Sequence, residues 1–185
     1  MKINNKGFAL PVSLMLLVVM TLMGATLVST TSSDIRSNNE RDNSSQAFYA
    51  AESGITMAKQ YLKQQTNYNV GNNPNNQLKF CKTSFFPNLN QGSVRAINNY
   101  VGRYNLSQIL SVSGKEKSRL DNYSTEYFVT LSPDANGNTS SANKKPGTKN
   151  TLYTIYSCGC NNNFNQCRSQ TDKIVSLEAV VTIVE

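Results

Sequence analysis

A hydrophobic run near the N-terminus, Phe8–Val28, is the longest apolar pattern in the chain. Its 21 residues include no charged side chain. At about 1.5 Å per residue, a helix of this length spans the ~30 Å hydrocarbon core of a lipid bilayer. The residues that interrupt its apolar character are few: Pro11, Ser13, Thr21, Gly24 and Thr26. The pattern therefore predicts one membrane-spanning helix.

The seven residues before this run, 1–7, are basic, with Lys2 and Lys6. Lysines that flank a membrane helix favour the cytoplasmic side, so we expect a cytoplasmic N-terminus and the rest of the chain outside the inner membrane. The run is longer than the core of a secretory signal peptide and has no small-x-small cleavage pattern at its far end. We therefore expect the run, residues 8–28, to remain in the mature protein.

A second helical pattern follows at Gln46–Leu62, where apolar residues recur at helical spacing. Glu52 and Lys59 lie on the opposite side, so the pattern predicts an amphipathic helix. Between the two patterns lie a polar patch, Ser29–Ser33, and a charged collar in which Arg36 and Glu40 have the spacing to meet on one face. We expect one helix to continue through residues 29–66. The residues assigned to helix packing are Ala47, Phe48, Ala51, Glu52, Gly54 and Ile55.

The C-terminal part of the chain predicts three strands, each with one apolar face; the first and last have apolar residues at alternate positions, and the middle one is rich in Thr, Tyr and Ile. The three strands lie at Tyr123–Leu131, Thr151–Cys160 and Lys173–Val184, separated by polar loops. Such strands form an antiparallel meander, and the amphipathic helix is its natural cover. The stretch Gln77–Asp121 has no clear period, and its part Ser93–Leu110 fits either a short helix or two weak strands. The predicted fold is α+β, with residues 67–185 forming a globular head.

Composition points to an exported surface domain and away from an enzyme. The chain has 25 asparagines, no histidine or tryptophan, and a formal charge of +7. Asparagine favours turns and loops, so we expect long polar loops over a small core. No nucleophile–base pair, metal triad or phosphate-binding loop is visible in the sequence. We predict no cofactor, no metal and no enzymatic activity.

Four cysteines, Cys81, Cys158, Cys160 and Cys167, predict two disulfides in an exported domain. Zinc is the alternative, but no histidine is available and thiols oxidise outside the inner membrane. Cys158 and Cys160 point to the same side of one predicted strand, so they are poorly placed to bond each other. Two pairings remain: Cys81–Cys158 with Cys160–Cys167, or Cys81–Cys160 with Cys158–Cys167.

Two features of the head could bind a ligand, although each can also be interpreted without one. The segment Asp134–Asn138 resembles part of a calcium loop, but it lacks a later bidentate glutamate and is followed by lysines, which favours a hairpin loop. Basic residues make the head positive, so nucleic acid or an acidic surface could bind there. The default interpretation is that these charges lie on loops and are solvated. These residues are Lys115, Lys117, Arg119, Lys144, Lys145 and Lys149.

The junction Lys6-Gly7-Phe8 resembles a prepilin cleavage site, in which a short basic leader ends in glycine before the hydrophobic run. The resemblance implies that a prepilin peptidase cuts after Gly7 and that the new amino group of Phe8 is methylated. An ordinary signal anchor would explain the lysines and the hydrophobicity equally well. Residues 1–7 would then be the leader and residues 8–28 the core helix of a filament subunit.

The segment Arg36–Ala58 is similar to the N-terminal region of the PilX-like family of type IV minor pilins. The matching residues are Arg41, Asp42, Ala47, Phe48, Ala50, Ala51, Glu52 and Gly54. The resemblance implies a subunit that sits in the inner membrane and then joins a pilus at the cell surface. Its implied partners are the prepilin peptidase, other minor and major pilins, and the inner-membrane assembly platform.

Val12 departs from most pilins, which carry a glutamate four positions after the first mature residue. That glutamate is thought to pair with the charged N-terminus of an adjoining subunit, because a lone charge in an apolar bundle is costly. The resemblance and the valine together predict a minor pilin for initiation at the pilus tip. The alternatives are a tip adhesin or DNA-binding subunit, and a type II secretion pseudopilin.

Overall fold

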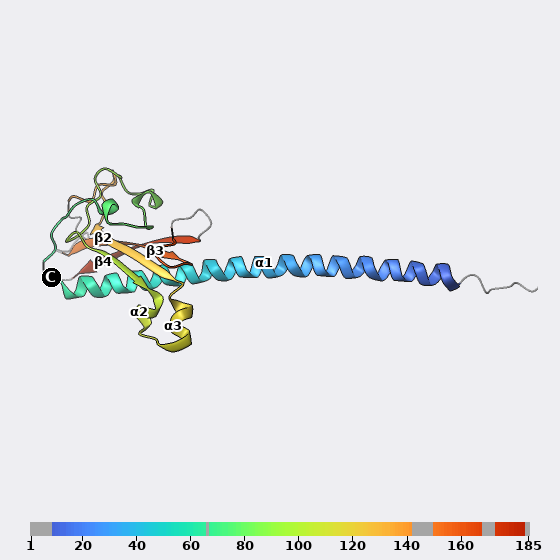
Figure 1. Ribbon diagram of the computed structural model, residues 1–185. Helices are drawn as coiled ribbons and strands as arrows, with labels where there is room; N and C mark the ends of the chain where they lie inside the picture. Colours follow the sequence, from blue (N-terminus) through green and yellow to red (C-terminus); the bar gives the residue numbers. More distant parts are fainter. Residues whose placement is uncertain (1–8, 66, 142–149, 168–172, 184–185) are drawn as a thin grey trace, which may run out of the picture. The chain divides into compact units, whose positions relative to one another are not determined.

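The computed structural model describes residues 9–65, 67–141, 150–167 and 173–183. The longest element is the helix α1 (Ala9–Gln64), and the sheet contains β1 (Val101–Asn105), β2 (Ser124–Leu131), β3 (Thr151–Cys160) and β4 (Ile174–Ile183). Short helices lie between: the 3-10 turns Pro74–Asn76 and Thr83–Phe85, and the helices α2 (Leu106–Leu110) and α3 (Gly114–Leu120). All strand pairs are antiparallel, in the order β1-β2-β3-β4 (Figure 1). The predicted α+β class is confirmed.

The chain divides into two compact units, Met1–Asp42 and Asn43–Glu185. The second unit contains the C-terminal part of α1 together with the sheet. This part of the helix packs on one sheet face through Ala58 and Leu62, whose side chains contact a buried cluster centred on β2 and β3. The strand residues in that cluster are Tyr127, Val129, Leu131, Tyr153 and Ile155. The amphipathic helix therefore covers the sheet, as its pattern predicts.

Helix α1 and strand β3 approach each other unusually closely at two glycines. A Cβ atom on Gly159 would lie 1.9 Å from the carbonyl oxygen of Ala47 and 2.4 Å from the nitrogen of Ala51. A Cβ atom on Gly54 would lie 2.2 Å from the Ser157 hydroxyl. The same hydroxyl donates a 2.8 Å hydrogen bond to the Ala51 carbonyl. Gly159 is therefore required where β3 meets the helix backbone, and Gly54 where the helix meets the Ser157 side chain.

The opposite sheet face is covered by the irregular segment between α1 and β1. Its apolar side chains Phe80, Phe86, Leu89 and Val94 pack on Phe128 and Tyr156 of the sheet. Two disulfides border this cluster: Cys81–Cys158 ties the segment to β3, and Cys160–Cys167 closes the loop after β3. These are the first of the two pairings considered from the sequence. A disulfide that closes a long loop contributes about 2–4 kcal/mol to stability.

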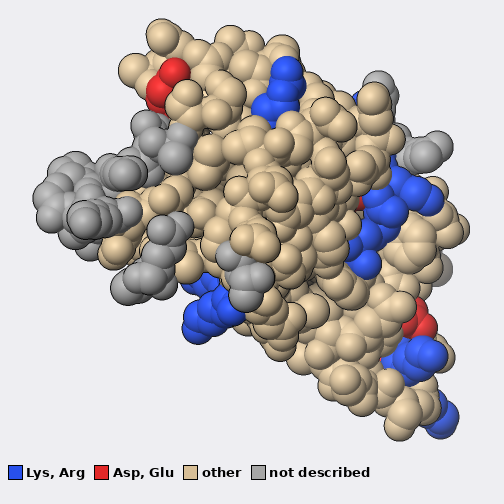
Figure 2. Space-filling model, turned by 90° about the vertical axis from the view of Figure 1, so that its left-hand side faces the viewer, with Lys and Arg blue, Asp and Glu red and all other residues tan. Residues whose placement is uncertain are grey.

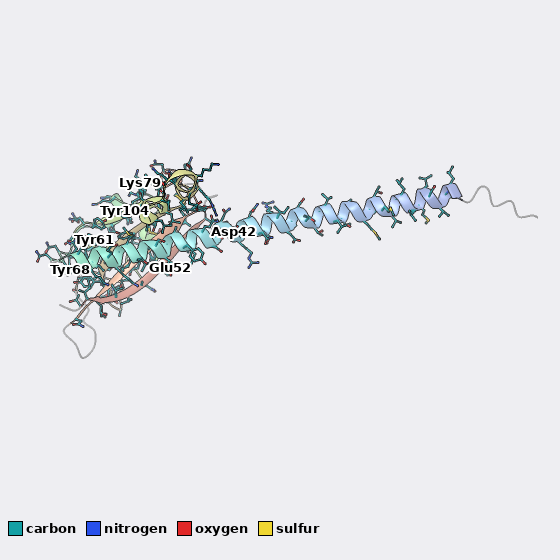
Figure 3. All side chains as sticks on the ribbon, turned by 90° about the horizontal axis from the view of Figure 1, so that it is seen from below. Asp42, Glu52, Tyr61, Tyr68, Lys79 and Tyr104 are labelled. Carbon is teal, nitrogen blue, oxygen red and sulfur yellow. A yellow bond between two sulfur atoms is a disulfide. The ribbon has the colours of Figure 1, made fainter. Side chains whose placement is uncertain are left out.

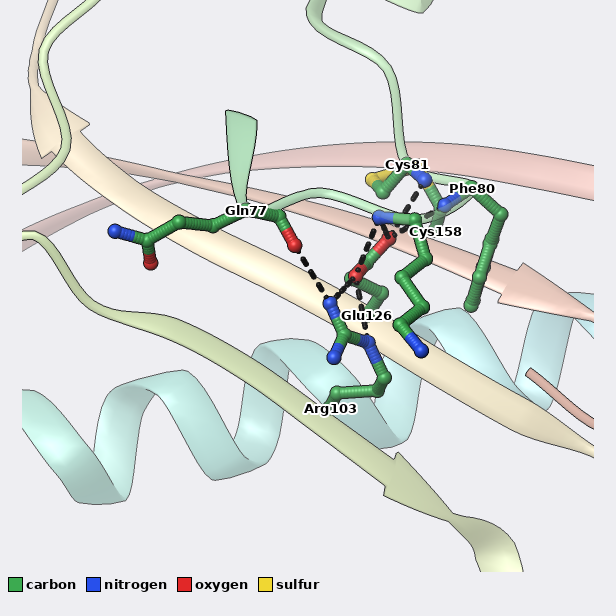
Figure 4. A network of polar contacts seen from close by, with 7 residues as sticks. Gln77, Phe80, Cys81, Arg103, Glu126 and Cys158 are labelled. Atoms are coloured by element: carbon green, nitrogen blue, oxygen red, sulfur yellow. Dashed lines mark hydrogen bonds and ion pairs between the residues drawn. A yellow bond between two sulfur atoms is a disulfide. The ribbon is translucent and has the colours of Figure 1, made fainter. Parts of the chain in front are cut away.

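Buried Glu126 fixes the start of the same segment (Figure 4). Its side chain is 0% exposed and accepts hydrogen bonds from the backbone N–H groups of Lys79, Phe80 and Cys81, at 2.8 to 3.1 Å. The Arg103 guanidinium donates to Glu126 Oε1 at 2.8 Å from Nε and 2.6 Å from Nη2. It also donates to the Gln77 carbonyl at 2.7 Å. One carboxylate thus joins β1, β2 and the covering segment.

The two central strands are buried on both faces, although the sequence pattern predicts one apolar face for each. All eight residues of β2 are buried, and so are the last eight of β3. The reason is that α1 covers one face while the segment after it covers the other. The edge strand β4 keeps the predicted alternation, with Val175, Leu177, Ala179, Val181 and Ile183 partly buried. The stretch that fitted either a helix or strands contains both, β1 followed by α2.

A cluster of tyrosines where α1 meets β1 and β2 predicts sensitivity to alkali. Tyr61 stacks on Tyr100 at 4.0 Å between ring centroids, and the hydroxyls of Tyr100 and Tyr104 lie 3.0 Å apart. Burial raises the pKa of Tyr100 to about 12 and that of Tyr127 above its ordinary range. The folded chain then holds these protons more tightly than the unfolded chain, whose tyrosines have a pKa near 10.

The free energy of unfolding should therefore keep its full value below about pH 10 and fall as the pH rises through about 12. Urea denaturation of the detergent-solubilised chain at pH 8 and pH 11 checks this. Tyr100→Phe should weaken the pH dependence, because it removes one titrating hydroxyl. Equal stability at the two pH values would contradict the prediction. All four cysteines are disulfide-bonded, so thiolate formation does not obscure the comparison.

Candidate functional site

The N-terminal part of α1 is an apolar helix that nothing in the described chain covers. From Leu10 to Asp42 every side chain is exposed, for example Leu10 at 70% and Met15 at 74%. An 18-residue window in this helix has a mean hydropathy of 2.2 and no buried part, so its length and composition suffice to cross a membrane. Such a surface is unstable in water and needs lipid or other apolar helices around it.

The polar side chains within the apolar part are satisfied by the helix itself. Ser13 donates to the Leu10 carbonyl at 2.9 Å, Thr21 to Val18 at 2.8 Å, and Thr26 to Met23 at 2.8 Å. Thr30 and Thr31 donate in the same way to carbonyls one turn earlier. Hydroxyls bonded to their own helix expose no unmatched donor to hydrocarbon. The whole run is therefore compatible with lipid or with a helical bundle.

No carboxylate lies in the apolar part of the helix. Val12, which the predicted cleavage after Gly7 would place four positions after the first mature residue, is 45% exposed. The first acidic residue along the chain is Asp34, after the polar patch. Nearby, Arg36 Nε and Glu40 Oε1 lie 3.8 Å apart, with both side chains exposed. An exposed pair of this kind contributes little to stability, so the collar marks the end of the apolar part and does not hold it in place.

The six residues assigned to helix packing lie on two different faces of α1. Ala47, Ala51 and Gly54 are buried against the sheet, and Ile55 is partly buried beside them. Phe48 is 43% exposed, and Glu52 is exposed as well, in the part of α1 labelled in Figure 3. Phe48 and its neighbour Tyr49 form an edge-to-face pair with centroids 6.0 Å apart. A packing role for Phe48 and Glu52 remains a prediction and would need a second chain.

The predicted cleavage site, Gly7–Phe8, lies outside the described residues, as do Lys144, Lys145 and Lys149. The turn at Asp134 is described, and its carboxylate is engaged locally. Asp134 Oδ1 accepts from the N–H groups of Asn136 and Asn138 at 2.8 and 2.9 Å, and these bonds lower its pKa. This geometry is that of a hairpin loop. Within the described ranges, no group of three histidine, cysteine or acidic residues is placed to hold a metal.

Positive side chains are dispersed over the described head. Lys115, Lys117 and Arg119 lie exposed on α3, where Glu116 pairs with Arg119 at 3.8 Å. Figure 2 shows Lys and Arg at separate places on one face of the molecule, divided by uncharged surface. A nucleic-acid site usually gathers its cations along one stripe or patch. Among the described residues on this face, the cations do not form such a stripe or patch.

Sequence reasoning identified the apolar helix and its collar but missed the role of Gly159 and Glu126. Gly159 stands between two cysteines in a strand pattern, where a glycine signals the close approach of another backbone. Glu126 occupies one polar position of an alternating strand, and its backbone partners lie 45 to 47 residues earlier. The sequence therefore contains a signal for the role of Gly159, but none for the role of Glu126.

A long helix with an apolar N-terminal part, whose C-terminal part packs on an antiparallel sheet, is the layout of a type IV pilin. Residues 6–56 match the family described as PilX N-terminal. This match covers less than a third of the chain, and it supports a PilX-like type IV pilin, a family of structural subunits that interact with other pilins in pilus assembly. No curated protein and no solved structure matches it.

Proposed function

We propose that this chain is a minor pilin that initiates type IV pili and remains at the tip. The observation that carries the proposal is Val12, in a helix that otherwise has the length and apolar surface of a filament-core helix. Before assembly the chain sits in the inner membrane as a single-pass protein, with the N-terminus in the cytoplasm and the disulfide-bonded head in the periplasm. Residues 1–7 are the leader that a prepilin peptidase removes.

The tip position follows from pairing charges in an apolar bundle. Each new pilin enters from below, and in the geometry of the family its glutamate reaches the charged N-terminus of the subunit above. A first subunit has nothing above it, so its glutamate would be a buried and unpaired charge. That arrangement would cost several kcal/mol or force the carboxylate to take up a proton. In the first subunit, valine avoids this cost. In any later subunit the glutamate would have a partner above it, and valine would avoid nothing.

Pilus counts test the assembly role. In cells that lack this chain, we expect few pili or none, and we expect pili to return when retraction is also blocked. This result identifies a factor that favours initiation over retraction. Normal pili with lost surface binding would instead indicate an adhesin and refute the proposal. Unchanged pili with lost protein secretion would indicate a pseudopilin.

Val12→Glu tests the tip position. We expect the amount of chain in the membrane to be unchanged, because membrane insertion tolerates one acidic residue near a helix end. Pilus number should stay the same or fall slightly, because the new carboxylate finds no partner above it. Val12→Leu is the matched control and should behave as wild type. A clear rise in pilus number with glutamate, or gold labelling of the head along whole sheared fibres at major-subunit density, would contradict a tip subunit.

A further inference from the structure

Two cysteines of β3 lie on the same side of the sheet, and Cys81 is bonded to one of them. Cys158 and Cys160 are two residues apart, so about 6.5–7 Å of strand separates them. Both belong to the buried cluster beneath the covering segment, together with Cys81 and Cys167. The observed bond joins Cys81 to Cys158, with their Cα atoms 5.3 Å apart. The head therefore forms one of two bonds that the strand alone makes nearly equivalent.

The unfolded chain has almost no preference between the two pairings. In the observed pairing the bonded cysteines are 77 and 7 residues apart. In the alternative, Cys81–Cys160 with Cys158–Cys167, they would be 79 and 9 residues apart. The entropic cost of closing a loop grows only with the logarithm of its length, so it favours the observed pairing by about 1.5-fold. A chain oxidised at random would therefore contain the two pairings in similar amounts.

Glu126 lies in the same row of the sheet as the cysteine that Cys81 bonds. Arg103 of β1 is the partner of Glu126 in β2, and Glu126 is the partner of Cys158 in β3. We call these three residues the cross-strand row (Figure 4). Direct partners in an antiparallel pair have their side chains on one face, with Cβ atoms about 4.5–5.5 Å apart. The Glu126 carboxylate therefore lies beside the Cys158 side chain.

The same carboxylate binds the backbone of Cys81. Glu126 Oε2 accepts hydrogen bonds from the N–H groups of Phe80 and Cys81, each at 2.8 Å. Arg103 Nη2 donates to Glu126 Oε1 at 2.6 Å, which fixes the carboxylate from the other side. Because Cys81 is bound through its own backbone, its sulfur is held in the row of Cys158.

The next row on this face offers no comparable acceptor. Cys160 is the partner of Ser124, whose hydroxyl donates to the Asn162 carbonyl at 2.8 Å. The partner of Ser124 in β1 is the uncharged Asn105. A hydroxyl has two acceptor lone pairs and no charge, whereas a carboxylate has about four acceptor sites. A covering segment displaced to the row of Cys160 would therefore lose its charge-assisted hydrogen bonds.

We propose that Glu126 is a positioning residue that selects Cys158 as the partner of Cys81 during oxidative folding. Cys81 and Cys158 are both 0% exposed in the folded head, so an oxidant reaches them only before the head closes. The backbone of Cys81 binds the carboxylate at that stage, while the rest of the covering segment is still open. The selection concerns the folding of the head alone, so it does not depend on the role in pilus assembly.

The bond forms by two thiol–disulfide exchanges with a disulfide oxidant. The Cys81 thiolate attacks the oxidant, which forms a mixed disulfide and releases one oxidant sulfur as a thiol. The Cys158 thiolate, held beside it, then attacks the Cys81 sulfur, which forms the protein disulfide and releases the second oxidant sulfur. The oxidant gains the two electrons that the cysteines lose, and both cysteine protons end on the released thiols.

A chain with three cysteines makes the selection measurable. The full chain with Cys167→Ser is reduced and unfolded in guanidinium chloride, then diluted into detergent with oxidised glutathione. The remaining free thiol is blocked with N-ethylmaleimide. The disulfide is then reduced, its thiols are blocked with iodoacetamide, and fragmentation in the mass spectrometer assigns the label on each cysteine. The readout is the ratio of Cys81–Cys158 to Cys81–Cys160.

We expect a ratio of at least about 10 after dilution, which corresponds to one hydrogen bond to a charged group. With guanidinium chloride retained during oxidation, the ratio should be near 1, since the two loops differ by two residues in length. Glu126→Gln should lower the ratio after dilution to about 2 or less. Leu62→Ala is the control, because it removes buried contacts on the opposite sheet face and leaves the cross-strand row unchanged. Its ratio should remain at least about 10.

A ratio that stays high in Glu126→Gln would overturn the proposal, as would an equal loss of the preference in Leu62→Ala. The second result would mean that the stability of the head as a whole sets the pairing. Near-ultraviolet circular dichroism shows which oxidised variants are folded. If Glu126→Gln does not fold, Glu126→Asp decides, because it keeps the charge but is one methylene shorter and withdraws from the Cys81 N–H. Its ratio should also fall to about 2 or less, and an unchanged ratio would refute the selection by Glu126.

Discussion

Gly159→Ala is expected to destabilise the head by about 2–3 kcal/mol or more, a large effect for one added methyl group. The new Cβ atom would lie 1.9 Å from the Ala47 carbonyl oxygen and 2.4 Å from the Ala51 nitrogen. Both are backbone atoms in the middle of a helix, so neither can move by a change of rotamer. The helix would have to leave the sheet, which would break the Ser157–Ala51 hydrogen bond.

Urea denaturation of the detergent-solubilised chain, followed by tyrosine fluorescence, measures this effect. Gly92→Ala is the matched control, because the atom nearest to its new Cβ would be 3.7 Å away. That variant should stay within about 0.5 kcal/mol of wild type, as is usual for surface substitutions. A Gly159→Ala chain as stable as the Gly92→Ala chain would show that α1 does not lie this close to β3.

Glu126→Gln should cost about 3 kcal/mol, and Glu126→Ala about 3–5 kcal/mol, because each leaves buried polar groups unpaired. The glutamine keeps the shape, but its NH₂ group faces backbone donors where the carboxylate accepted from Lys79, Phe80 and Cys81. It also leaves the Arg103 guanidinium without its counter-charge. The covering segment should loosen first at these residues.

Hydrogen exchange distinguishes this local loosening from general instability. The amides of Phe80 and Cys81 should exchange faster in Glu126→Gln, while those of β3 change less. Glu116→Gln is the control, since the Glu116 side chain is 55% exposed and pairs with Arg119 at the surface. It should be nearly neutral, as exposed ion pairs contribute about 0–1 kcal/mol. If Glu126→Gln exchanges like wild type, the carboxylate does not hold the segment.

The sequence predicts those parts of the fold that have a period. Residues Ile174–Ile183 alternate and form β4, within the predicted range Lys173–Val184. The apolar run and the amphipathic pattern form one helix, because no proline or glycine lies between them. The covering segment after α1 could not be predicted, because contacts distant in sequence hold it. Its anchor, Glu126, occupies a polar position of an alternating strand, a pattern that is equally typical of solvent exposure.

The candidate site can likewise be predicted from the sequence only in part. Ala47 and Ala51 are small residues at helical spacing, so their packing face is readable from the sequence, and both are buried. Phe48 is a large aromatic residue in the same motif, and its partial exposure depends on the direction in which α1 meets the sheet. That direction is set by Gly54 and Gly159, whose meaning appears only when the two backbones lie together. The cross-strand row likewise becomes visible only once the strand register is known.

The mature N-terminus tests most directly that this chain is processed and used as a pilin. Intact-mass and peptide analysis of chain extracted from membranes of the native host should show loss of Met1–Gly7 and one added methyl group on Phe8. The same species should be absent from cells that lack the prepilin peptidase, where Met1 remains. If the intact Met1 form is the sole species in wild-type membranes, the chain is an ordinary signal-anchored protein and the pilin function is refuted.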